Sequence, residues 1–214
     1  MLRRFIAGIA GHALVIVVRL VTAPRAIWSG IEPIPRQRVY FANHTSNADF
    51  PTVWAVLPSF LRQKTRPVAA SDYWLKSRLR AFFGRDVLNA VLINRDRAGR
   101  DPAEDPVALM VAALDAGTSL IIFPESGRNL SKNSVMAFKT GLYHLASERP
   151  EIDLVPVWID NLNSVLPKGE IVPVPLICTV TFGGPMHIRP GEEKERFLER
   201  SREALAGLAG ERET

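Results

Sequence analysis

Short apolar segments alternate with helical patterns along this chain, and this alternation most constrains its fold. Residues 119–123 (SLIIF) contain no charged side chain. A strand that is apolar on both faces is typical of a sheet covered by helices on both sides. The amphipathic pattern at 104–116 predicts a helix before this strand, ending near Gly117. The sequence therefore predicts a single α/β domain with a mixed sheet flanked by helices.

The rest of the chain continues the alternation. Its 214 residues, 47% of them hydrophobic, suffice for one domain with its own core. Because proline suits the first turn of a helix, a helix is expected to begin near Pro51. Further strands are predicted at 38–42, 65–70, 90–93, 153–159 and 176–182, and further helices at 134–147 and 191–209.

The N-terminal segment 5–24 is apolar and about as long as a minimal membrane span. At 100° per residue, one side of a helix here carries a polar and small set, namely Arg4, Gly8, Gly11, His12, Val15 and Arg19. The opposite side is apolar, which favours a helix lying in the bilayer interface. A signal peptide cleaved near Ala23 and a buried core helix are the alternatives.

We therefore expect residues 1–24 to form a membrane-associating helix and residues 25–214 to form the domain. The charges are divided unevenly between the two halves. Residues 1–100 carry 16 Lys and Arg against 5 Asp and Glu, a net of +11, and residues 101–214 carry 11 against 17, a net of −6. A basic, apolar half predicts contact with an anionic surface. No nucleic-acid-binding motif accompanies it, so we expect no nucleic acid and instead a membrane with anionic lipid, at its cytoplasmic face.

A second segment, 73–85, mixes aromatic and basic side chains. Leu75, Leu79 and Phe82 would share one face of a helix there, with Lys and Arg beside them. Tyr and Trp next to Lys and Arg suit a bilayer interface. Ordinary packing of this face against the core explains the pattern equally well.

Metal and thiol chemistry have weak support in the sequence. Cys178 is the single cysteine and lies in an apolar run, so we expect a buried thiol in a reducing compartment. The four histidines form no H-x-x-x-H pair, and no metal ion is expected. Ser126 lacks the first glycine of a G-x-S-x-G nucleophile elbow, which argues against a covalent acyl-enzyme.

Three polar clusters follow predicted apolar strands, at 43–49, 94–95 and 124–129. Ligands of open α/β sheets bind at the carboxyl ends of the strands. The placement of the clusters therefore predicts that they form one site.

His44 and Asp49 are the first candidates within these clusters. On one helix they would lie about 140° apart, but they meet if His44 is in a loop and Asp49 opens the next helix. A carboxylate would then hold one imidazole nitrogen and leave the other free to accept a proton. The alternative is a loop histidine beside an aspartate that only caps the helix.

A turn at 125–128 is the second candidate. A tight turn after a buried strand exposes backbone N–H groups, and Arg128 would add a planar fork that suits phosphate. Arg95, which ends what we expect to be the neighbouring strand, would supply a second positive charge. Surface ion pairs explain either arginine as well.

Four sequence blocks resemble those of one known family. Residues 43–51 (NHTSNADFP) resemble the N-H-x-x-x-x-D block of the glycerolipid acyltransferases, the lysophosphatidic acid acyltransferase family. Residues 93–95 (INR) are similar to the second block, and residues 123–129 (FPESGRN) to the third, usually F-P-E-G-T-R-S. Residues 155–157 (VPV) are similar to the fourth. The blocks occur in the family's order, and the resemblance covers about residues 38–185.

The resemblance implies a role for each candidate. His44 would be the general base that deprotonates the acceptor hydroxyl, and Asp49 would orient it. The acyl group would come from the thioester of acyl-CoA or acyl carrier protein, with no cofactor or metal. Arg95 and Arg128 would hold the acceptor phosphate. The pocket around that phosphate would be shaped by a further set, Glu125, Ser126 and Gly127.

The activity implied is acylation of 1-acylglycerol-3-phosphate to phosphatidate at a membrane. The chain departs from the family where Ser126-Gly127 replaces Gly-Thr and Asn129 replaces serine. A different lysophospholipid or an acyl-amino acid lipid as acceptor, a non-catalytic lipid-binding protein, and a thioesterase are therefore the alternative hypotheses.

Overall fold

A sheet of seven strands organises the part of the chain that the computed structural model describes. That part comprises residues 1–94, 104–125, 127, 129, 135–160, 162 and 178–209. In spatial order the strands are β1 (Arg25–Trp28), β7 (Thr179–Phe182), β6 (Asp153–Asp160), β2 (Arg38–Ala42), β5 (Ser119–Ile122), β3 (Thr65–Ala70) and β4 (Val91–Ile93).

Neighbouring strands run parallel, except that β6 and β7 are antiparallel. The sheet is therefore mixed, which confirms the predicted fold class. The central strand β2 is fully buried and lies between β5 and β6. Its pairing with β5 aligns Phe41 with Ile122, so the two strands end together.

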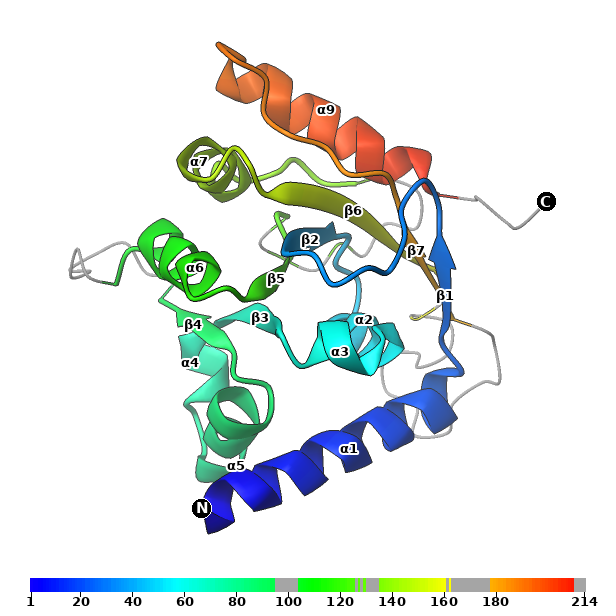
Figure 1. The fold of residues 1–214 in the computed structure, drawn as a ribbon, viewed down its shortest axis with the longest axis vertical. Coiled ribbons are helices and arrows are strands. Elements are labelled where there is room, and N and C mark those ends of the chain that lie inside the picture. The colour runs from blue at the N-terminus through cyan, green and yellow to red at the C-terminus, as the bar shows by residue number, and fades with distance from the viewer. Residues whose placement is uncertain are drawn as a thin grey trace.

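The side chains of β2 alternate between two cores. Val39 and Phe41 belong to the hydrophobic core on one face of the sheet, whereas Tyr40 and Ala42 belong to the core on the other face. This alternation is the period of an extended strand. The first core is covered by α6 (Pro106–Asp115), α7 (Gly141–Glu148) and α9 (Lys194–Gly207), and the second by α1 (Leu2–Thr22), α2 (Asp49–Val56) and α3 (Ser59–Arg62) (Figure 1).

The helix α1 turns its small and polar side toward the domain. Ala7, Gly11 and Val15 are buried, and a Cβ added at Gly11 would lie in ordinary van der Waals contact, 3.7 Å from the Trp54 ring. The guanidinium of Arg19 donates to the backbone oxygen of Ala55 at 3.1 Å. This side is the one that the sequence pattern singled out.

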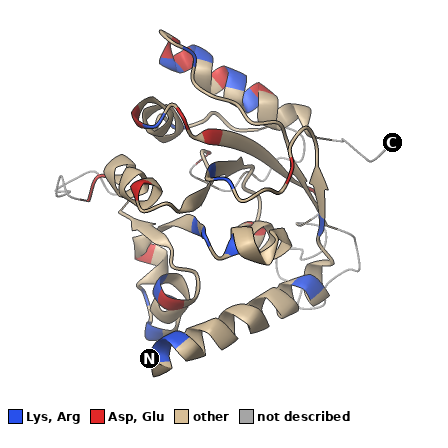
Figure 2. Cartoon of the chain, in the orientation of Figure 1, with Lys and Arg blue, Asp and Glu red and all other residues tan. Residues whose placement is uncertain are grey.

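The other side of α1 is exposed and apolar. Phe5, Ile9 and Leu20 are 67%, 56% and 79% exposed. The alternative of a buried core helix is therefore wrong. By length and composition alone α1 is able to cross a membrane. Figure 2 shows Lys and Arg only near its two ends.

The 73–85 segment does not form one helix, contrary to the shared face that we predicted. It divides into α4 (Ser71–Trp74), α5 (Arg78–Ala81) and the π-helical turn η1 (Phe82–Val87). The break occurs at Ser77, where the backbone is extended. The Ser77 hydroxyl then caps a new helix by accepting a hydrogen bond from the Arg80 N–H. Leu75 and Leu79 are exposed, whereas Phe82 is partly buried.

One helix begins much later than the sequence predicts, and one strand was not predicted at all. The helix predicted at 134–147 begins only at Gly141, and residue 134 lies outside the described residues. The N–H groups of Met136 and Lys139 donate instead to Glu125 and to the Pro124 carbonyl. Strand β1 was not predicted, because it is a short edge strand stabilised by its pairing with β7.

Candidate active site

Two of the three polar clusters meet at one edge of the sheet. His44 follows β2 and Glu125 follows β5, and these strands are adjacent, parallel and end together. The third cluster follows β4, which β3 separates from β5. The expectation that Arg95 ends a neighbouring strand is therefore wrong. Arg95, Ser126 and Arg128 themselves lie outside the described residues.

The carboxylate of Asp49 is the buried centre of this edge. Its side chain has no exposed surface. One oxygen, Oδ2, accepts hydrogen bonds from the backbone N–H groups of Thr45 at 2.6 Å and Ser46 at 2.8 Å. The same oxygen lies 2.8 Å from Nδ1 of His44. Asp49, the first residue of α2, thereby accepts hydrogen bonds from both the backbone of the loop and the imidazole.

This geometry selects one tautomer of His44. A carboxylate accepts hydrogen bonds, so Nδ1 must carry the proton that faces Oδ2. Nε2, on the far side of the ring, then has a free lone pair. The ring stacks on Phe123 with centroids 4.5 Å apart, and the side chain keeps 23% of its surface exposed. An oriented, accessible imidazole of this kind is able to accept a proton from a hydroxyl.

Glu125 ties the loop after β5 to the loop after β2. One carboxylate oxygen accepts from the His44 N–H at 3.2 Å, and the other accepts from the Met136 N–H at 3.1 Å. In return the Asn129 N–H donates to the His44 carbonyl at 2.6 Å. Burial raises the pKa of the Glu125 carboxyl, although hydrogen bonds from Met136, His44 and Asn129 partly offset this effect.

Asn43 fixes the end of β2 from the other side. Its amide donates to the Ile159 carbonyl at 3.0 Å and accepts from the Ile159 N–H at 2.7 Å. The side chain is buried, so this pair also satisfies the polar groups of a β6 residue. Sequence reasoning missed this role and that of Phe123, although both residues belong to the quoted blocks.

The described residues offer little for metal or thiol chemistry. They contain no group of three His, Cys, Asp or Glu side chains that is arranged to hold a metal ion. Cys178 is buried, as expected, and burial raises the pKa of its thiol to about 12. A thiol with that pKa is not a nucleophile at neutral pH.

Of the predicted pocket residues after Glu125, the structure describes Gly127, which has open space where a Cβ would point.

Comparison with known proteins assigns the family. A family model described as "Acyltransferase" matches residues 25–160, a range of 136 of the 214 residues that includes His44, Asp49 and Glu125. The chain belongs to the acyltransferase family. The resemblance seen in the sequence blocks is thereby confirmed at the level of the family. No curated protein matches the acyltransferase sequence significantly.

A solved structure supports the fold of this acyltransferase. The chain is similar to the 1-acyl-sn-glycerophosphate (LPA) acyltransferase PlsC from Thermotoga maritima, with 21% sequence identity and a TM-score of 0.64. The match covers 90% of this chain and 75% of the other. At this identity the likeness shows a shared α/β fold.

Replacement of Glu125 by glutamine tests the link between the two loops. A glutamine side chain has a single oxygen, so one of the two backbone N–H groups would face an amide NH₂ group that does not accept. We expect Glu125→Gln to lower the free energy of unfolding by about 1–3 kcal/mol, measured by urea denaturation. The control is Glu148→Gln, an exposed position on α7. Equal stability of the two variants would show that the link is dispensable.

Proposed function

We propose that this acyltransferase acylates 1-acylglycerol-3-phosphate at its free hydroxyl to give phosphatidate. The donor is acyl-CoA or acyl carrier protein. The observation that carries the proposal is the contact of His44 with the buried carboxylate of Asp49. The sequence blocks and the activity named for the similar Thermotoga maritima protein support this choice of acceptor.

The proposed reaction is direct transfer. Nε2 of His44 accepts the proton of the acceptor hydroxyl as its oxygen forms a bond to the thioester carbonyl carbon. The tetrahedral intermediate then collapses, the C–S bond breaks, and the thiolate leaves with the proton from the imidazolium. Asp49 stabilises that imidazolium and keeps the ring in the tautomer that starts the cycle. No cofactor or metal ion takes part.

The acceptor phosphate is assigned to arginine side chains. In the family resemblance Arg95 and Arg128 bind it, and a guanidinium suits a phosphate because two N–H groups contact two oxygens. Glu125 and Asn129 support this role indirectly, since they connect the Arg128 loop to the backbone of His44. Ser126 and Gly127 complete the proposed phosphate pocket.

We propose that α1 associates with the cytoplasmic face of a membrane. Its outward side exposes Phe5, Ile9 and Leu20, while its inward side is held by the domain. The helix α5 lies near its N-terminal end (Figure 1) and exposes Leu79 together with Arg78. Apolar side chains that penetrate and basic side chains that meet anionic headgroups together favour a membrane surface with anionic lipid.

A second candidate keeps the chemistry and changes the acceptor. The support is the third block, where Ser126-Gly127 and Asn129 replace the usual Gly-Thr and serine. Asn129 is buried and hydrogen-bonded to His44, so this departure lies inside the site. A panel of lysophospholipids and acyl-amino acid lipids decides between acceptors, because turnover with another acceptor and none with lysophosphatidate would favour this candidate. A non-catalytic lipid-binding protein has less support, since His44 and Asp49 are in contact.

Removal of the proposed base tests the reaction. We expect palmitoyl-CoA to release its thiol only when lysophosphatidate is present, and His44→Ala to slow this release by about 10²–10⁴-fold. His144→Ala, at an exposed histidine of α7, is the matched control and should retain activity. Release that is independent of the lipid would identify a thioesterase instead. Lipid-dependent release that survives in His44→Ala would remove His44 from the mechanism.

Arg128→Ala tests the assignment of the phosphate. Loss of one charge-assisted contact should raise the KM for lysophosphatidate by about tenfold to a hundredfold, with a much smaller change for the acyl donor. Steady-state kinetics with each substrate varied in turn measures both values. Arg196→Ala, at an exposed arginine of α9, controls for the lost charge. A KM that rises equally for both substrates would contradict the assigned role.

Membrane association is tested on the exposed side of α1, because deleting the helix would also uncover the core. We expect Ile9→Glu combined with Leu20→Glu to weaken retention on phosphatidylglycerol-containing vesicles at least about tenfold. As the control, Ile34→Glu places one glutamate on an exposed apolar residue outside α1, to be compared with Ile9→Glu alone as well as with the double variant. If both proteins sediment equally with the vesicles, α1 is not the anchor.

A further inference from the structure

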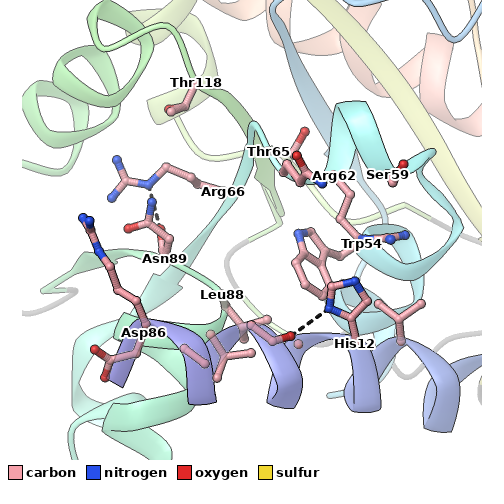
Figure 3. A pocket seen from close by; sticks show the side chains of 17 residues that line it. His12, Trp54, Ser59, Arg62, Thr65, Arg66, Asp86, Leu88, Asn89 and Thr118 are labelled. Carbon is pink, nitrogen blue, oxygen red and sulfur yellow. Dashed lines mark hydrogen bonds between the residues drawn. The ribbon is translucent and has the colours of Figure 1, made fainter. Parts of the chain in front are cut away.

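A cavity of about 330 Å³ lies beneath α1, apart from the candidate active site. Its wall includes His12 of α1, Trp54 of α2, Arg62 of α3 and Arg66 of β3 (Figure 3). Thr118, which also lines it, directly precedes β5. The candidate active site follows the other end of β5, about 16 Å away at roughly 3.3 Å per residue. The cavity is therefore not the place where the acyl group is transferred.

Two arginines of the cavity carry charge that no described carboxylate neutralises. Arg62 donates to the carbonyl of Leu57 at 3.0 Å, and Arg66 donates through Nε to the carbonyl of Asn89 at 2.6 Å. Neither forms an ion pair within the described ranges. Burial lowers the pKa of both guanidiniums, and the charge of Arg19 lowers that of Arg62 further. Since a guanidinium has five N–H groups, each arginine keeps donors for another partner.

A further arginine of the wall adds to this excess of positive charge. The cavity is also lined by Arg4 and by one carboxylate, Asp86, which is already paired with Arg3 at 2.8 Å. The wall therefore carries three arginines against one carboxylate, which is already paired.

We propose that this cavity binds a phosphate group, supplied either by the headgroup of an anionic phospholipid or by free phosphate. A planar guanidinium presents two N–H groups to two oxygens of a phosphate, and Arg62 and Arg66 line opposite parts of the cavity (Figure 3). The volume is that of a small-ligand site. Its place against the inner side of α1, whose outer side is exposed and apolar, brings a membrane headgroup within reach. The site is distinct from the phosphate site assigned to the acyl acceptor.

The first test uses Arg66→Gln in the full-length protein in neutral detergent. Inorganic phosphate is titrated in by calorimetry, and the cavity should bind one phosphate per chain in addition to any phosphate that the acceptor site binds. Arg66→Gln removes the charge and should weaken binding about tenfold or more. Arg196→Gln is the matched control, because Arg196 is exposed on α9 and does not line the cavity.

Gly8→Leu provides a second variant that keeps every charge. An added Cβ at Gly8 meets no atom within 4 Å, so the leucine fits and fills the cavity. Leucine also favours a helix over glycine. This variant should weaken phosphate binding like Arg66→Gln. Gly207→Leu, the same change at an exposed glycine of α9 that also has open space beside it, should leave binding unchanged.

The second arm of the test identifies the source of the phosphate. Retention on phosphatidylcholine vesicles is compared with and without phosphatidylglycerol. A loss of the phosphatidylglycerol-dependent part in Arg66→Gln and Gly8→Leu, beyond that in Arg196→Gln and Gly207→Leu, supports the headgroup. Loss of calorimetric binding alone supports free phosphate. If the cavity variants match their controls in both arms, or if the unmodified protein binds neither probe, the proposal is wrong.

Discussion

The hydrogen bonds of the Asp49 carboxylate hold the candidate active site together. A buried carboxylate is costly unless donors surround it, and here two backbone N–H groups and the imidazole of His44 do so. The same contacts close the loop after β2 and fix the first turn of α2. That helix carries Trp54 to the contact with α1. One buried charge thus determines the tautomer of His44 and the start of the helix on which α1 packs.

The order and register of the strands determine which residues lie near this carboxylate. Because β2 and β5 are adjacent, parallel and in register, the loops that follow them emerge side by side. Glu125 and Asn129 then exchange hydrogen bonds with the backbone of His44, so neither loop is able to move independently. Asn43 fixes the same point to β6. The base is therefore oriented by its own loop and positioned by two neighbouring strands.

Much of this arrangement follows from local sequence. The apolar strands were predicted at close to their observed bounds, because burial on both faces leaves a local signature in β5 and β2. The contact of His44 with Asp49 follows from a loop placed before a helix. The separation of β4 from β5 does not, since strand order depends on crossover connections. The late start of α7 could not be predicted from local sequence either, because it depends on a hydrogen bond from the Met136 N–H to Glu125, eleven residues earlier. The break at Ser77 was missed because the apolar pattern of residues 73–85 fits one longer helix, whereas Ser77 starts a new one.

The central claim is that Asp49 acts through His44, and a double-mutant cycle tests it most directly. The kcat/KM for acyl transfer is measured for the unmodified protein, His44→Ala, Asp49→Asn and the double variant, below the unfolding temperature of each. If Asp49 only orients the base, the double variant is no slower than His44→Ala. Losses that multiply, with Asp49→Asn costing as much without His44 as with it, would contradict the account.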